Sequence, residues 1–256
     1  MEENNPSPPL EIFHDPETLV RAAAEKMTRL GAAAAEKNGM FTVALSGGST
    51  PRPLYTRLAA ERFAGAIDWS RVHLFWGDER CVPPDDPRSN YRMVRESLLD
   101  AIPIPPKNVH RIHGEEDPQG AAAAYERELR TFFGSKGAEG PPRAGFDLVL
   151  LGLGEDGHTA SLFPGMAAVK QQRRWVMAQF MEGLSMWRIT LTPPVINAAK
   201  EVIFLVSGAE KARRLRDVLE GPLQPEALPA QMIKPAQGRL LWLVDDAAAG
   251  CLKTAR

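Results

Sequence analysis

The stretch that decides the fold spans residues 41–51 and reads FTVALSGGSTP. Its first half, 41–45, is a short and mostly apolar run that predicts a buried β-strand. Gly47 and Gly48 then predict a tight loop, and Pro51 is favoured at the first position of a helix. The stretch therefore predicts a strand, a polar loop and a helix in immediate succession, which is the repeating unit of an α/β protein.

The same unit recurs along most of the chain. Further strands are expected at 72–76, 146–151, 189–191, 202–206 and 240–244, and helices at 16–38, 51–62, 89–99, 121–133, 207–219 and 247–253. Strands without polar alternation, separated by helices, indicate a mostly parallel sheet with helices on both faces. We expect residues 1–10 to form a disordered lead-in and residues 11–256 a single α/β domain.

The boundary signals of two helices are specific. Asp15 and Pro16 predict the N-cap and first turn of the first helix, and Asn38-Gly39 its end. Ser207 and Glu210 form a capping-box pattern that predicts the start of the helix reaching Leu219. The remaining connectors are a Gly/Pro-rich stretch at 134–145 and a Pro-rich loop at 221–238.

The composition excludes several classes of function. The 256 residues include 31 Lys and Arg against 32 Asp and Glu, which gives a formal net charge of −1. Nucleic-acid and anionic-membrane binders usually carry a basic excess, so neither partner is expected. Cys81 and Cys251 lie far apart and form no zinc-ligand or disulfide pattern, and no metal is predicted. The acidic N-terminus and the lack of a long apolar run favour a cytoplasmic protein.

Four expected strands end in polar or Gly-rich segments. These segments are Ser46–Thr50, Gly77–Arg80, Gly152–His158 and Ser207–Lys211. Any one of them could be a plain turn. Because ligands of open α/β sheets bind beyond the carboxyl ends of the strands, four such segments at one edge predict a binding site there.

The segment that contains Ser49 and Thr50 is suited to a phosphate group. Glycines let the backbone fold around an anion, and the following helix N-terminus adds partial positive charge. Because prolines remove donors from that helix turn, the two hydroxyls would have to share in the binding. The Gly-Lys-Ser/Thr of a Walker loop is absent. The alternative is a simple helix cap by one of the hydroxyls.

Gly152, Gly154 and Gly157 match the dinucleotide pattern GxGxxG, but we reject that interpretation. A Pro-Gly pair stops any following helix within about two turns, and the expected acidic residue about 20 positions on is missing. We instead expect the loop to hold Asp156 and His158 beside a short helix, whose positive end would keep the imidazole neutral and able to accept a proton. The alternative is that His158 is a solvent-facing cap.

Two further segments carry charges at strand ends. In Gly77–Arg80, the carboxylate of Asp78 could orient water, and the guanidinium of Arg80 could stabilise developing negative charge. Lys211 lies in the first helical turn, where the helix dipole disfavours a cation unless an anion is bound. The alternative for Asp78 and Arg80 is a surface ion pair. The alternative for Lys211 is that it is one more solvated residue in a basic run.

Taken together, the motifs resemble the 6-phosphogluconolactonase family, within the larger group that includes glucosamine-6-phosphate deaminase. The matching segments are LSGGSTP at 45–51, WGDER at 76–80, VP at 82–83, SNY at 89–91, GLGEDGHTASLFPG at 152–165, RITLT at 188–192 and SGAEKA at 207–212. The resemblance implies a three-layer α/β sandwich with a Rossmann-like sheet, the deaminase/isomerase-like fold. One stretch departs from the family pattern, at 178–187, and leaves the contacts to the far side of the sugar open.

The resemblance also implies roles for individual residues. It places the phosphate on Gly47, Gly48, Ser49, Thr50, Arg188 and Lys211. It makes His158 the catalytic base, supported by Asp156, with Asp78 and Arg80 as further polar groups of the active site. It implies no metal and no organic cofactor.

The expected reaction is hydrolysis of 6-phospho-D-glucono-1,5-lactone to 6-phospho-D-gluconate in the oxidative pentose phosphate pathway. His158 would activate water, with either Asp156 fixing its tautomer or Asp78 orienting the water. Two alternatives remain: an amino-sugar phosphate deaminase or isomerase on the same scaffold, and a non-catalytic sugar-phosphate sensor. Apart from the small phosphorylated substrate, the only partner expected is the chain itself, as a monomer or small homo-oligomer.

Overall fold

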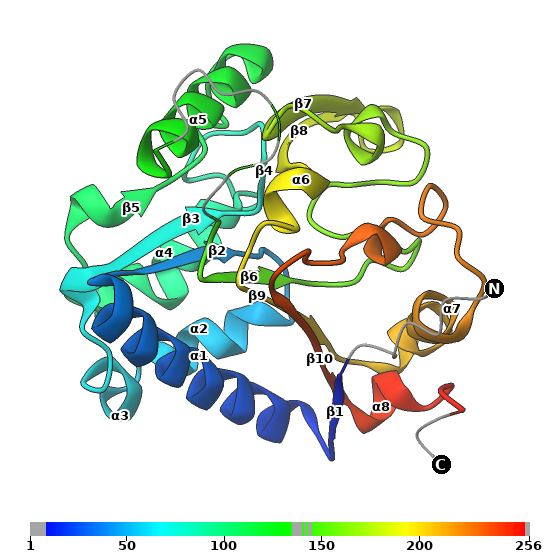
Figure 1. The fold of residues 1–256 in the computed structure, drawn as a ribbon, viewed down its shortest axis with the longest axis horizontal. Coiled ribbons are helices and arrows are strands. Elements are labelled where there is room, and N and C mark those ends of the chain that lie inside the picture. Colours follow the sequence, from blue (N-terminus) through cyan, green and yellow to red (C-terminus); the bar gives the residue numbers. More distant parts are fainter. Residues whose placement is uncertain (1–8, 135–139, 141, 143–144, 254–256) are drawn as a thin grey trace.

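The computed structural model describes residues 9–134, 140, 142 and 145–253. Its centre is a seven-stranded sheet in the order β1-β10-β9-β6-β2-β3-β5, in which every neighbouring pair is parallel (Figure 1). The strands are β1 (Leu10–Phe13), β2 (Phe41–Leu45), β3 (Val72–Trp76), β5 (Val109–His110), β6 (Leu148–Leu151), β9 (Glu201–Val206) and β10 (Arg239–Asp245). The expected α/β class and mostly parallel sheet are confirmed.

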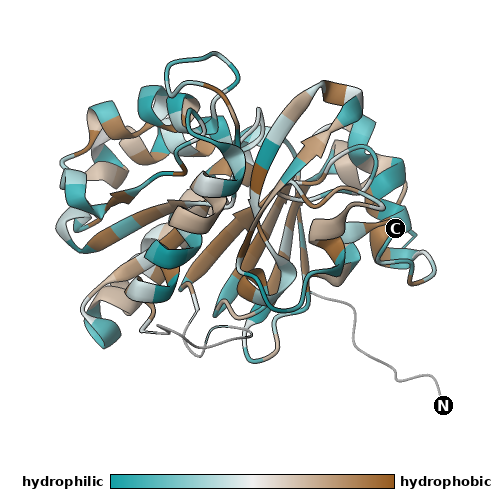
Figure 2. Ribbon diagram, turned by 90° about the horizontal axis from the view of Figure 1, so that it is seen from above, coloured by the Kyte–Doolittle hydropathy of each residue, from teal (hydrophilic) through white to brown (hydrophobic). Residues whose placement is uncertain are grey.

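Helices cover both faces of this sheet. Figure 1 shows α1 and α2 below the strands and α5 above them. The helices are α1 (Pro16–Asn38), α2 (Pro51–Ala59), α3 (Glu61–Ala64), α4 (Asn90–Ser97), α5 (Pro118–Phe132), α6 (Pro193–Ile196), α7 (Ala212–Glu220) and α8 (Asp246–Ala249). The central strands are strongly hydrophobic, whereas the helices mix apolar and polar residues (Figure 2). This arrangement is the three-layer sandwich that the resemblance implied.

The predicted ends of α1 are confirmed by its caps. The Asp15 carboxylate accepts a hydrogen bond from the backbone N–H of Thr18 at 2.7 Å, and Thr18 completes a capping box. At the other end Gly39 adopts a φ of 78°, in the left-handed region that glycine tolerates without strain. Local sequence signals are sufficient here because both caps are made by residues close in the chain.

The N-terminal boundary differs from the prediction. Leu10, the last residue of the predicted lead-in, begins β1 and is paired with Trp242 of β10. Residues 1–8 lie outside the described residues. A four-residue strand at the edge of a sheet carries little periodicity, so its pairing with the distant β10 is what identifies it.

A second, antiparallel sheet was not predicted as such. It has the order β4-β8-β7 and consists of β4 (Asp78–Arg80), β7 (Val176–Met181) and β8 (Met186–Leu191). Only the end of β8 was expected as a strand. The sheet matters for the site because Arg80 and Arg188 are directly opposite each other across β4 and β8.

Five predicted helices have different ends. The helix expected over 89–99 covers Asn90–Ser97, and the one expected over 121–133 covers Pro118–Phe132. The helix expected over 51–62 ends at Ala59, where Ala60 takes an extended conformation, and the last helix ends at Ala249. The predicted capping box at Ser207 is wrong. Its hydroxyl donates instead to Asp245 at 2.5 Å, and α7 follows a 3₁₀ turn over Ala209–Lys211. A tertiary partner has therefore replaced the local cap.

A single hydrophobic core cluster includes residues from Leu19 near the start of α1 to Leu252 beyond α8. Within the described ranges, no helix has the length and apolar character needed to cross a lipid bilayer.

Candidate functional site

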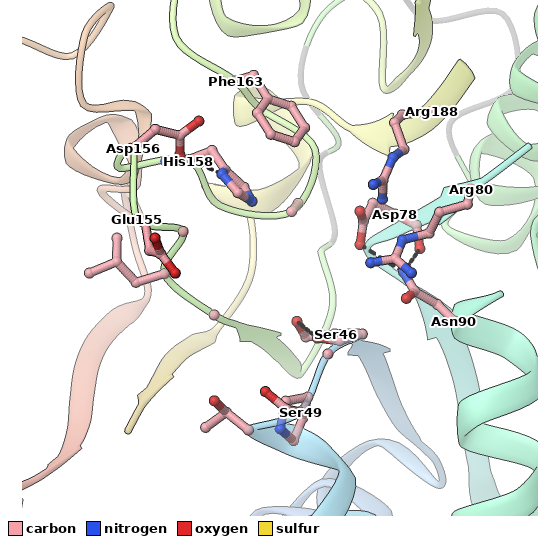
Figure 3. A pocket seen from close by; sticks show the side chains of 18 of the residues that line it. Ser46, Ser49, Asp78, Arg80, Asn90, Glu155, Asp156, His158, Phe163 and Arg188 are labelled. Carbon is pink, nitrogen blue, oxygen red and sulfur yellow. Dashed lines mark hydrogen bonds and ion pairs between the residues drawn. The ribbon is translucent and has the colours of Figure 1, made fainter. Parts of the chain in front are cut away.

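The four polar segments meet at the carboxyl edge of the parallel sheet, as the strand order requires. They enclose a cavity of about 540 Å³ that lies beyond the ends of β2, β3, β6 and β9 (Figure 3). The lining residues are Ser46, Gly47, Gly48, Ser49, Thr50, Pro51, Asp78, Arg80, Asn90, Gly152, Leu153, Gly154, Glu155, Asp156, His158, Ala160, Phe163, Leu184, Arg188 and Lys211. Every residue predicted for the site lines this one cavity.

The Gly47–Thr50 loop is conformationally restricted at both of its glycines. Gly48 has a φ of 108°, and a Cβ on Gly47 would lie 1.9 Å from the side-chain oxygen of Asn90, so neither position accepts a larger residue without change. Thr50 is the N-cap of α2, yet within the described part of the chain its side chain makes no capping hydrogen bond. The hydroxyl therefore remains available to a ligand, which weighs against the simple-cap alternative.

Arg80 and Arg188 form a pair of cations on the opposite wall from His158 (Figure 3). The Nε atoms of both are buried and have no hydrogen-bond partner among the described residues. Burial and the neighbouring charge of Arg80 lower the pKa of Arg188 from its ordinary value. Two adjacent guanidiniums with unused donors are stabilised by a bound anion, because it supplies both the missing acceptors and the compensating charge.

Asp78 lies in a buried hydrogen-bond network beside this arginine pair. Its carboxylate accepts from the hydroxyl of Ser161 at 2.5 Å and from the side-chain amide of Asn90 at 3.2 Å. The same amide donates to the backbone carbonyl of Asp78 at 2.9 Å. With only 6% of the residue exposed, Asp78 is fixed by these contacts.

Sequence reasoning did not assign Asn90 or Ser161 to the site. Both belong to motifs that carry the family resemblance, but their polar atoms meet Asp78 only in the folded chain. The neighbouring Glu79 stabilises the same region. Its buried carboxylate accepts hydrogen bonds from the backbone N–H groups of Arg80, Asn90 and Tyr91 at 2.7–2.8 Å. These bonds join β4 to the start of α4.

His158 is held between a carboxylate and an aromatic ring. Its Nδ1 atom lies 2.5 Å from Oδ1 of Asp156, and the same oxygen accepts the backbone N–H of His158 at 3.0 Å. The imidazole stacks on Phe163 with ring centroids 4.1 Å apart. Because Asp156 engages Nδ1, Nε2 is the ring nitrogen left for the cavity. Of the two carboxylates considered as helpers of His158, Asp156 contacts the imidazole, whereas Asp78 lies beside the arginine pair on the opposite wall (Figure 3).

The electrostatics of Asp156 reflect this contact. Partial burial alone would raise its pKa, but the hydrogen bonds from the side chain and backbone of His158 outweigh burial and hold the pKa below its ordinary value. The lowered pKa favours the ionised carboxylate, which can only accept a hydrogen bond, so the contact favours the tautomer with the proton on Nδ1.

One element of the prediction around His158 is wrong. No helix begins there: Thr159 and Leu162 form an isolated β-bridge, and Ala160 has a φ of 48°, which a helix does not allow. The short helix whose dipole was expected to act on the imidazole therefore does not form at this point of the chain. The flanking glycines instead serve packing, since a Cβ on Gly154 would lie 2.1 Å from Nδ1 of His158.

Lys211 closes the cavity from the side of β9. It is the last residue of the 3₁₀ turn before α7, and 19% of its side chain is exposed. Its Nζ lies 3.8 Å from the carboxylate of Glu155, a long contact that leaves the ammonium able to bind a second anion. Across the described ranges, no group of three or more His, Cys, Asp or Glu side chains has the arrangement of a metal site.

Comparisons with known proteins agree with this geometry. A family model described as glucosamine-6-phosphate isomerases/6-phosphogluconolactonase matches residues 14–242. A 6-phosphogluconolactonase of Nostoc sp. is 42% identical over 93% of this chain and 96% of its own length. One of Haemophilus influenzae is 37% identical over 90% of this chain and 95% of its own length.

Solved structures of 6-phosphogluconolactonases are also similar to this chain. The 6-phosphogluconolactonase of Trypanosoma brucei is superimposed with a TM-score of 0.81 at 32% identity, covering 95% of this chain and 98% of that chain. A monomeric glucosamine-6-phosphate deaminase shares the fold, with a TM-score of 0.79 at 20% identity. Both covered shares in that case are above nine-tenths, at 95% and 99%.

Proposed function

The chain belongs to the glucosamine-6-phosphate isomerase/6-phosphogluconolactonase family, and on that premise we propose that it hydrolyses 6-phospho-D-glucono-1,5-lactone to 6-phospho-D-gluconate. The observation that carries the proposal is the Asp156–His158 pair facing two arginines with unused donors across one cavity. A base and an anion-binding wall on opposite sides are what lactone hydrolysis requires.

The phosphate group anchors the substrate. Ser49, Thr50 and Gly48 offer hydroxyls and a backbone conformation suited to an anion, while Arg188 and Lys211 supply charge. Binding energy from this remote group orients the lactone carbonyl towards the base.

His158 acts as the general base. Its Nε2 takes a proton from a water molecule, whose oxygen attacks the lactone carbonyl carbon at C1. The carbonyl π electrons pass to oxygen, and Arg80 stabilises the resulting oxyanion. When the tetrahedral intermediate collapses, the bond from C1 to the ring oxygen breaks, and His158 returns its proton to that oxygen. Asp156 holds the tautomer and stabilises the transient imidazolium.

Asp78 has a positioning role in this scheme. Both of its carboxylate oxygens are already engaged by Ser161 and Asn90, so it fixes the wall that carries Arg80. Every proton transfer is assigned to His158, so the scheme needs no metal, and EDTA should leave the rate unchanged.

The test compares the full chain with fresh lactone against the spontaneous hydrolysis rate, alongside glucosamine 6-phosphate with ammonia release as the readout. We expect enzymatic lactone hydrolysis and no ammonia. Ammonia release without lactonase activity would assign the deaminase or isomerase reaction instead. Binding of 6-phosphogluconate without turnover of either substrate would identify a sensor and overturn the proposal.

A further inference from the structure

A second cavity lies beside the substrate cavity and has no role in the proposed reaction. Its volume is about 1000 Å³, at the upper end of the range for small-molecule sites. Its walls are the N-terminal part of α1, the first turns of α2, the short α3 and the loop after β9. The space is therefore large enough for a ligand bigger than the sugar phosphate.

The chemistry of this second cavity is an apolar floor with a basic rim. Leu19, Val20 and Phe63 form the buried base of this floor and are at most 8% exposed, while Pro16, Pro53 and Ala60 supply exposed apolar surface. The charged residues of the rim are Arg21, Arg52, Arg57, Arg62, Glu17 and Glu210. Four cations against two anions give the cavity a positive balance, although the chain as a whole has a net charge of −1.

The rim arginines are weakly compensated. Arg52 and Arg57 form ion pairs with glutamates at nitrogen-to-oxygen distances of 3.4 Å. Both pairs are exposed, and such pairs contribute little to stability. Over the residues that the structure describes, Arg21 and Arg62 form no ion pair with a carboxylate. The Arg62 guanidinium lies 5.7 Å from the ring centroid of Phe63, within the range of a cation–π contact.

The two cavities share a wall. Ser49 and Thr50 line both of them. On the other side of the phosphate, Lys211 lines the substrate cavity, while its near neighbours Gly208 and Glu210 line the second cavity. A ligand in the second cavity would therefore contact the reverse side of both segments proposed to hold the substrate phosphate.

We propose that this second cavity is a regulatory site for a nucleoside polyphosphate. Arginine side chains bind phosphate oxygens in bidentate fashion, and the apolar floor accepts the flat face of a base. A free sugar phosphate has no such apolar face and would leave the floor unused. Because the bound polyanion would lie just across the Ser49–Thr50 loop from the substrate phosphate, like-charge repulsion would weaken substrate binding and raise KM.

The binding test needs no catalytic activity and so stands apart from the proposed function. Calorimetric titration of the full chain with ATP, without magnesium, should show one binding site. Adenosine and inorganic triphosphate should each bind to this site at least tenfold more weakly than ATP does. The double variant Arg21→Glu/Arg62→Glu should lower ATP affinity at least tenfold. The control Arg127→Glu/Arg174→Glu makes the same charge change at two exposed residues that do not line this cavity, and should change the ATP affinity less than twofold. Absence of ATP binding, or equal affinity for triphosphate, would overturn the assignment.

The coupling test rests on the proposed lactonase activity and separates two modes of inhibition. Occupation of a distinct site predicts that KM for the lactone rises about three- to tenfold and then reaches a plateau, with kcat unchanged. The Arg21→Glu/Arg62→Glu variant should keep its basal kcat and KM and lose the ATP effect. A KM that rises linearly without a plateau would mean that ATP occupies the substrate cavity, and would refute a separate site.

Discussion

Asp156→Asn is the substitution that most sharply separates orientation of the base from binding of the substrate. The carboxylate accepts from Nδ1 of His158 at 2.5 Å and from its backbone N–H at 3.0 Å. An asparagine has nearly the same shape, but it lacks the charge and can present its amide N–H₂ to Nδ1, which would favour the wrong tautomer.

The size of the effect follows from the contact. Hydrogen bonds to charged groups contribute about 1.5–3 kcal/mol. Because 48% of the Asp156 side chain is exposed, solvent screening places this bond at the lower end, about 1.5–2 kcal/mol. We therefore expect kcat to fall about 10- to 30-fold. KM should stay within twofold, since Asp156 contacts none of the proposed phosphate-binding groups.

The assay is the initial rate of hydrolysis of freshly prepared lactone at pH 7, corrected for the spontaneous reaction. Glu155→Gln is the matched control: it removes a neighbouring carboxylate that lines the same cavity but whose ion-pair partner is Lys211. Its kcat should stay within threefold of the parent. The reasoning fails if Asp156→Asn retains full kcat, or if the two variants lose the same amount.

Three further substitutions test the surroundings of the site and the stability of the fold. Gly47→Ala places a Cβ 1.9 Å from the Asn90 oxygen, so urea unfolding should show a loss of about 1–3 kcal/mol and kcat/KM should fall at least tenfold; an unchanged variant would show that the loop is not constrained. Phe163→Leu removes the ring stacked on His158, which predicts a two- to tenfold lower kcat at constant KM, and a pure KM effect would contradict a positioning role. Hydrogen bonding to Arg111 lowers the pKa of Glu115 to about 2, so the ionised carboxylate stabilises the fold by under about 1 kcal/mol above about pH 5, and this contribution is lost as the pH falls towards 2. The difference in unfolding free energy between the parent and Glu115→Gln, measured in urea at pH 7 and pH 3, should therefore be smaller at pH 3. A larger difference at pH 3 would contradict the lowered pKa.

The parallel sheet and the position of the site were predictable because they depend on local patterns. The run 41–51 sets strand, loop and helix within a few residues, and parallel strands then bring all their carboxyl ends to one edge. For this reason the sequence alone was sufficient to predict that Ser49, Asp156 and Lys211, which are far apart in the chain, lie at one edge of the sheet, where they line one cavity.

The features that sequence reasoning missed depend on long-range contacts. β7 and the first part of β8 alternate irregularly between buried and exposed residues, and only their pairing with each other and with β4 makes them strands. The position of Ser207 predicted a local helix cap, but its hydroxyl donates a hydrogen bond to Asp245 at the end of another strand. A short helix was expected beside His158, yet Ala160 has a positive φ, and the next residue, Ser161, is hydrogen-bonded to the distant Asp78 and Thr190. In each case a tertiary partner determines the local conformation.

The central claim is that His158 is the base for lactone hydrolysis, and His158→Gln tests it most directly. The measurement is single-turnover hydrolysis of fresh lactone with the variant in excess, with 6-phosphogluconate affinity determined in parallel to verify that the cavity is intact. General-base catalysis by a positioned histidine is worth about 10²- to 10⁴-fold. We predict a rate lower by at least 100-fold with 6-phosphogluconate affinity within threefold of the parent. A variant that binds the product normally and still hydrolyses the lactone at the parent rate would contradict the account.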